Sequence, residues 1–132
     1  MTMTSDQASD LSRRFRDLSG AVRQNLLSNW DTLTQGQRNS LQGAEYSLLN
    51  GSSTLITAAV GFALDESGVS FEKLQDSVNT ANEAIQALKE VQTALAIAAA
   101  GVDLAGAIIA HNPGGAAKAI AAVYTAAKTS PG

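Results

Sequence analysis

Apolar residues recur at steps of three and four along most of this chain, and this spacing predicts α-helix. The first such stripe begins at Leu11. Thr4 and Gln7 fit a capping box ahead of it, because the hydroxyl and the amide can each satisfy a free backbone N–H. Gly36 fits its end. The pattern therefore predicts a first helix over about residues 5–35.

A second stripe follows, in which large apolar residues return every seven positions. Its members are Leu41, Leu48, Leu55 and Phe62. The pair Asn50-Gly51 favours left-handed backbone and would normally indicate a break. The seven-residue phase nevertheless continues across this pair. We therefore expect one helix over about residues 39–66, with a hinge or kink at Gly51.

The third segment has the longest periodic pattern. Gly68 breaks the preceding helix, and Ser70 can cap the next one. From Phe71 to Ile109, apolar and small residues keep an unbroken alternation of three and four, a heptad seam typical of a coiled coil. The sequence predicts a single helix over about residues 70–110, which would be about 60 Å long at 1.5 Å per residue.

The motif HNPGG at residues 111–115 ends that helix. His111 suits a helix C-terminus, and the asparagine and proline that follow suit the cap and first position of a new helix. Because the turn is short, we expect the last helix, about residues 113–128, to fold back antiparallel. Gly114 and Gly115 are hinge candidates at this turn.

Together these segments predict an all-α fold in a single domain, residues 1–132. No stretch shows the alternation of a strand. We expect an elongated antiparallel helical bundle with three long helices and one short C-terminal helix, the last two forming an Ala/Gly-rich hairpin.

Alanine and glycine dominate residues 94–128, which raises the question of membrane insertion. Asp103 lies in the middle of the run, and a carboxylate there would cost roughly 2.5–3.5 kcal/mol in a membrane-spanning helix. Small pairs such as Gly101/Ala105 and Gly106/Ala110 instead allow helices to approach closely. The pattern favours close helix packing, and it leaves membrane entry as a triggered event with Asp103 as a polar switch.

The predicted last helix is too short to cover the third along its whole length, so an apolar face would remain open to a partner. The apolar stripe from Leu11 to Leu33 and the seam from Phe71 to Ile109 would be buried in such contacts. The residues that we expect to pack against partner helices are Trp30, Leu88, Leu95, Gly101, Val102, Gly106, Ile109, Ile120 and Tyr124.

The amino-acid composition disfavours several classes of catalytic and binding site. The chain has no cysteine and one histidine, which is poor material for a zinc site, a di-iron bundle or a Ser-His-Asp triad. No phosphate-binding loop motif occurs. A net charge of −3 disfavours binding to a nucleic-acid backbone. We expect no enzymatic activity, cofactor, metal, small-molecule substrate or nucleic-acid partner.

The sequence thus predicts a non-enzymatic helical protein that acts by interaction or self-assembly, with another copy of itself or another helical protein as partner. The alternative is a membrane-active protein, pore-forming or translocator-like, that exposes residues 94–128 to lipid on triggering. The N-terminus lacks the charged-then-apolar order of a Sec signal peptide, which predicts a cytoplasmic protein or export by a signal-independent route.

Overall fold

The computed structural model describes residues 1–65, 68–87 and 91–128. The α-helices in these ranges are α1 (Ser5–Ser28), α2 (Gln35–Ala58), α3 (Phe71–Ala87), α4 (Val91–Ile109) and α5 (Pro113–Lys128), with a 3-10 turn η1 (Trp30–Thr32) between the first two. The described residues contain no strand beyond an isolated bridge between Thr2 and Ala63. The all-α fold class is confirmed.

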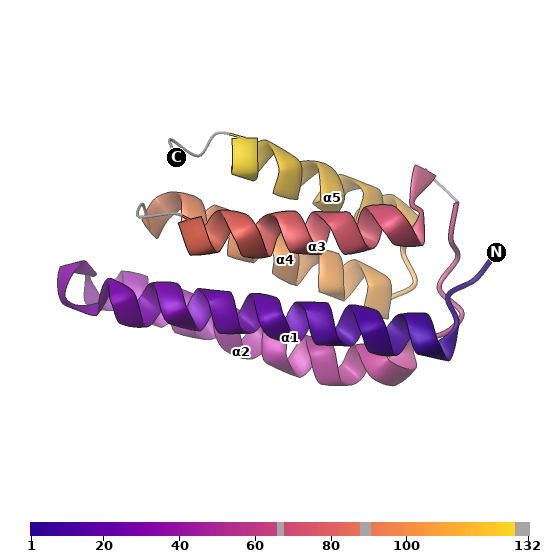
Figure 1. Ribbon diagram of the computed structural model, residues 1–132, viewed down its shortest axis with the longest axis horizontal. Coiled ribbons are helices and arrows are strands. Elements are labelled where there is room, and N and C mark those ends of the chain that lie inside the picture. Colours follow the sequence, from indigo (N-terminus) through magenta and orange to yellow (C-terminus); the bar gives the residue numbers. More distant parts are fainter. Residues whose placement is uncertain (66–67, 88–90, 129–132) are drawn as a thin grey trace.

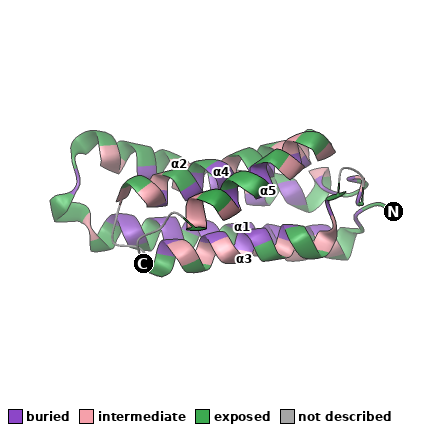
Figure 2. Ribbon diagram, turned by 90° about the horizontal axis from the view of Figure 1, so that it is seen from above, coloured by how far each residue is buried: buried purple, intermediate pink, exposed green. Residues whose placement is uncertain are grey.

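The helices form an elongated bundle in which each helix runs antiparallel to the next (Figure 1). Helices α1 and α2 pack side by side in one layer, with α3 against α1 and α4 against α2 in the layer above. Helix α5 covers the outer side of α3 and α4. Buried positions lie along the inward faces of the helices (Figure 2), so one core runs the length of the bundle.

The first helix is shorter than its apolar pattern predicts, because a second capping box restarts the chain. Thr4 and Gln7 cap α1 as expected. Helix α1 ends at Ser28, however, and Thr34 and Gln37 form the same reciprocal pair of hydrogen bonds at the start of α2. A capping box satisfies two otherwise unpaired N–H groups and fixes a helix start. The prediction of one helix over residues 5–35 is therefore wrong at its C-terminal end.

The second helix is continuous but ends before its predicted boundary. Helix α2 runs through Gly51 without a break in the helix. It ends at Ala58, and Gly61 then adopts a φ of 86°. The chain after it pairs with the segment before α1, because the Met3 N–H donates to the Phe62 carbonyl at 2.8 Å and the Gly61 N–H donates to the Met3 carbonyl at 2.9 Å. This pairing ties the segment before α1 to the segment after α2.

The predicted single helix over residues 70–110 is two helices. The Ser70 hydroxyl accepts from the Lys73 N–H at the start of α3, as expected. Helix α4 then returns antiparallel to α3 (Figure 1). The heptad seam describes the buried face of α3 correctly, with Leu74, Val78, Ala81 and Ile85 in the core.

In α4 the buried face is displaced by about one residue from the predicted seam. The buried residues of α4 are Ala94, Ile97, Ala98, Ala100, Gly101, Leu104, Ala105 and Ile108. Almost every position of this helix is apolar or small, so several faces satisfy the same spacing. Nothing in such a pattern identifies which face a neighbour covers, and the unbroken phase concealed the reversal of direction.

The turn between α4 and α5 lies at the predicted position, and its backbone forms a defined helix-capping motif. His111 has a φ of 54°, and the N–H groups of His111 and Asn112 donate to the carbonyls of Ile108 and Ala107, a Schellman motif. The Asn112 side chain then accepts from the Gly115 N–H at 3.0 Å and caps α5. Gly115 leaves room for this cap, because a Cβ there would lie 2.7 Å from Asn112 Nδ2.

Candidate interaction surface

Two of the singled-out glycines lie where α4 meets the lower layer. A Cβ on Gly101 would stand 2.9 Å from Leu18 Cδ2 and 3.6 Å from Leu48 Cδ2. A Cβ on Gly51 would stand 3.5 Å from the Cβ of Ala105. Small residues therefore do bring helices close together here, but the helices belong to the same chain.

The other candidates on α4 lie away from the centre of the core. Leu95, Val102 and Ile109 are half-buried at its edge. Asp103 and Gly106 are exposed, and Gly106 has open space around it. The carboxylate of Asp103 thus reaches water from the outer side of the helix. Leu88 lies outside the described residues.

Trp30 lies on the surface in η1, with 42% of its area exposed. Its ring is covered on one side by the guanidinium of Arg38, 4.4 Å from the ring centroid. Arg38 also donates from Nη2 and Nε to the Trp30 carbonyl, at 2.6 and 3.0 Å. Trp30 is therefore not an anchor of the intramolecular core, and its outer face is open to a partner.

The two residues of α5 that the sequence predicts as partner contacts are Ile120 and Tyr124. Ile120 is buried in the core. Tyr124 is half-buried at the edge of the core, and its hydroxyl donates to Asp76 Oδ2 on α3. Partial burial, together with the hydrogen bond to Asp76 and the negative charge of that residue, raises the pKa of Tyr124 to about 12. This contact joins α5 to α3. Gly114 lies exposed in the first turn of α5.

Among the residues that the structure describes, most of the large exposed apolar side chains lie elsewhere, on a face that the sequence pattern does not predict as a contact surface. The large exposed residues are Tyr46, Leu49 and Ile56 along the outer side of α2 and Val60 in the turn directly after it, a set that we call the α2 stripe. Gln42 and Ser53 occupy the intervening positions and are also exposed. The full series is spaced 4-3-4-3-4, which is a heptad pattern. This spacing was readable in the sequence, in parallel with the buried seven-residue repeat one position away.

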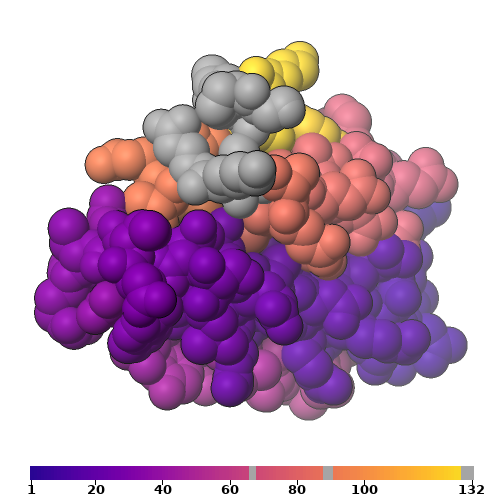
Figure 3. All heavy atoms as spheres, turned by 60° about the vertical axis from the view of Figure 1, so that its left-hand side comes forward, coloured from indigo at the N-terminus to yellow at the C-terminus, as the bar shows by residue number. Residues whose placement is uncertain are grey.

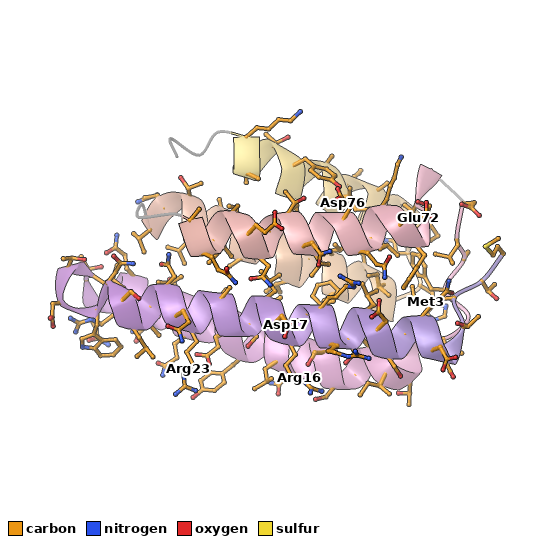
Figure 4. The ribbon with its side chains drawn as sticks, in the orientation of Figure 1. Met3, Arg16, Asp17, Arg23, Glu72 and Asp76 are labelled. Atoms are coloured by element: carbon orange, nitrogen blue, oxygen red, sulfur yellow. The ribbon has the colours of Figure 1, made fainter. Side chains whose placement is uncertain are left out.

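The α2 stripe continues onto the end of α1. Leu27 and Trp30 are exposed beside it, and together with Tyr46 and Leu49 they line a hollow of about 250 Å³ between the two helices. The arginines Arg16 and Arg23 extend to the same side (Figure 4). The space-filling view shows the surface of α1 and α2 forming the lower half of this end of the molecule (Figure 3).

Charged groups along the α2 stripe are few, and the exposed Asp31 lies next to Trp30 in η1. Between Gln35 and Val60 the chain carries only Arg38 and Glu45. Glu45 is largely buried at its side chain and lies 3.9 Å from Arg23 on α1. The acidic residues Glu72 and Asp76 belong to α3, on the opposite side of the molecule (Figure 4).

A second polar feature holds α1 to α3. Asp10 Oδ2 accepts from Arg14 Nε at 3.1 Å and from Gln75 Nε2 at 2.5 Å, and Arg14 Nη1 donates to Asn79 at 2.9 Å. Partial desolvation acts to raise the pKa of Asp10, but these hydrogen bonds and the charges of Arg14 and Arg13 outweigh it and lower the pKa below its ordinary value. The network is partly exposed and links two helices.

The described ranges contain no group of three or more His, Asp or Glu residues that could hold a metal ion. One of their helices, α4, is long and apolar enough to cross a membrane by length and composition, although 44% of its most apolar stretch is buried in the bundle. A core helix of a soluble protein meets the same criterion. No family model, curated protein or solved structure matches this chain.

Proposed function

We propose that this chain is a non-enzymatic helical protein that works by protein–protein interaction and self-assembly, and that the α2 stripe with Leu27 and Trp30 is its contact face. The observation that carries the proposal is the exposure of these large apolar residues on one side of the bundle. Contiguous apolar patches on soluble proteins are typically interaction sites.

The exposed fractions support this choice of surface. They are 56% for Tyr46, 53% for Leu27, 42% for Trp30 and Ile56, 41% for Val60 and 39% for Leu49. Tryptophan and tyrosine are over-represented among the residues that carry binding energy. By contrast, the stripe from Leu11 to Leu33 apart from Trp30, and the core positions of α3 and α4, are already covered within the chain.

Size-exclusion chromatography with light scattering, in the presence and absence of liposomes, tests the proposal. We expect the mass to rise above 13.6 kDa with protein concentration in the absence of lipid. A mass of one chain at every concentration, together with no binding to any helical partner in a screen with purified candidate proteins, would contradict it.

A second function, triggered entry of the α4–α5 hairpin into a membrane, draws support from the apolar composition of α4. Its buried share and the exposed Asp103 make a trigger necessary, because the bundle would have to open. Dye release from liposomes tests this function. Leakage that increases in Asp103→Asn would support it, and intact liposomes under all conditions would contradict it.

A further inference from the structure

We propose that the partner of the α2 stripe is a second copy of this chain, paired antiparallel through α2 with the two-fold axis near Ser53. This inference rests on the proposed function and makes it specific. In this pairing Tyr46 lies opposite Val60 of the second copy, and Leu49 lies opposite its Ile56.

The arrangement of residues along α2 and the turn after it is self-complementary. Tyr46 in the helix and Val60 in the turn lie seven positions to either side of Ser53, and Leu49 and Ile56 lie four and three positions from it. A two-fold contact requires a surface that matches itself after rotation. The small Ser53 at the centre lets two helices approach closely, and the larger residues interlock on both sides of it.

The charges favour the antiparallel orientation. Helix α2 has no acidic residue in its first turn and no basic residue in its last turn, so its dipole is not compensated by its own charges. Arg23 and Arg38 lie near the N-terminal half of α2. In this register the negative C-terminus of the partner's α2 lies opposite Leu48 and thus close to Arg23, whereas a parallel partner places its positive N-terminus beside Arg38.

The area is also sufficient for a dimer. The outward parts of the α2 stripe, Leu27 and Trp30 offer on the order of 500 Å² of apolar surface. Stable interfaces bury about 800 Å² on each partner, of which somewhat more than half is apolar. The exposed polar residues between and beside these side chains supply the remainder. Helix α2 carries only one charge of each sign, so two copies meet without strong repulsion.

Engineered cysteines test the orientation, because the chain contains no cysteine of its own. Under mild oxidation we expect no disulfide between copies of Tyr46→Cys alone or of Val60→Cys alone. When the two variants are mixed, we expect a disulfide that joins position 46 of one copy to position 60 of the other. Ser53→Cys should cross-link to its own copy, because it lies on the axis. Thr54→Cys, exposed on another side of α2, is the matched control and should not cross-link.

Each other result overturns the inference in a distinguishable way. Self-disulfides of both Tyr46→Cys and Val60→Cys indicate a parallel pair. A wild-type mass above one chain without any of these disulfides overturns the antiparallel α2 pairing, while self-assembly, the general part of the proposed function, still holds. A wild-type mass of one chain contradicts self-assembly itself. Wild-type protein that stays monomeric yet binds vesicles of phosphatidylserine and phosphatidylcholine assigns the arginine-flanked stripe to a lipid surface.

Discussion

At the scale of single residues, the neighbouring side chains determine whether a glycine in a helix is needed for close packing. Gly101 and Gly106 lie on the same helix and look alike in the sequence. Gly101 is buried against Leu18 and Leu48, whereas Gly106 is exposed with nothing near it. Glycine weakens a helix interior relative to alanine wherever it stands. Only at Gly101 does close packing against another helix offset that cost.

The two glycines therefore predict different responses to the same substitution. Gly106→Ala should raise the free energy of unfolding by about 0.5–1 kcal/mol, because it removes the conformational cost of glycine. Gly101→Ala should be less stable than Gly106→Ala by about 1–3 kcal/mol, because Leu18 and Leu48 must shift to admit the methyl group. Urea unfolding of both variants measures this difference, and equal stabilisation by both would contradict the packing described here.

Tyr124 gives a prediction for alkaline pH. Its pKa of about 12 lies above the ordinary value of about 10, so the neutral phenol is stabilised in the folded chain. The corresponding stability is fully present below about pH 10 and is lost as the pH rises from about 10 to 12. In a Tyr46→Phe background, phenolate absorbance reports Tyr124 alone, and we expect a midpoint near 12.

Asp76→Asn in the same background separates the two causes of this shift. We expect the midpoint to fall only in part, because desolvation, the larger cause, remains. If Tyr124 titrates with a midpoint near 10 in the Tyr46→Phe variant, where Asp76 is unchanged, the burial of Tyr124 and its hydrogen bond to Asp76 would be contradicted.

At the scale of elements, local signals were more reliable than long periodic patterns. Thr4, Ser70 and the asparagine before α5 cap helices where the sequence predicts them. The Thr34–Gln37 box was equally readable, and it would have separated α1 from α2. The failure at residues 70–110 has a different cause. An apolar run with little polar contrast fits several faces equally well, so its period establishes helix without establishing direction or partner.

His111 shows how an element boundary is held by contacts distant in sequence. The residue takes the left-handed conformation that glycine usually adopts at this cap. Its Nε2 lies 2.6 Å from the Ala58 carbonyl at the end of α2, and its ring packs edge-on to Phe62 at 6.1 Å. These contacts join the α4–α5 turn to the chain around the end of α2, so any hinge motion at residues 111–115 would have to break them.

This corner predicts an order of stability among variants. His111→Ala should lower the free energy of unfolding by about 1–2 kcal/mol, because it loses the hydrogen bond and keeps the cost of a left-handed residue. His111→Gly also loses the bond but removes that cost, so it should be more stable than His111→Ala by about 1 kcal/mol. Thermal unfolding at neutral pH compares them, and the reverse order would contradict the cap.

At the scale of the whole molecule, the sequence predicts an all-helical fold and the small residues needed for close packing, but the close packing that the structure shows lies within the chain. The Ala/Gly-rich helices α4 and α5 complete the core of their own chain. Apart from Met1, the large apolar side chains exposed among the described residues belong to α2, the end of α1 and the turns that follow these two helices. Which of several apolar stripes stays exposed depends on how the helices stack, and helical period alone does not contain that information.

The central claim is that the α2 stripe joins this chain to a second copy, and sedimentation equilibrium over a dilution series tests it most directly. The proteins compared are the wild type, Ile56→Glu within the stripe, and Thr54→Glu on another exposed side of the same helix. We predict that the wild type and Thr54→Glu rise from 13.6 kDa towards twice that mass with concentration, while Ile56→Glu dissociates at least ~10-fold more readily. A wild type that remains at 13.6 kDa throughout, or an Ile56→Glu that associates as strongly as Thr54→Glu, would contradict it.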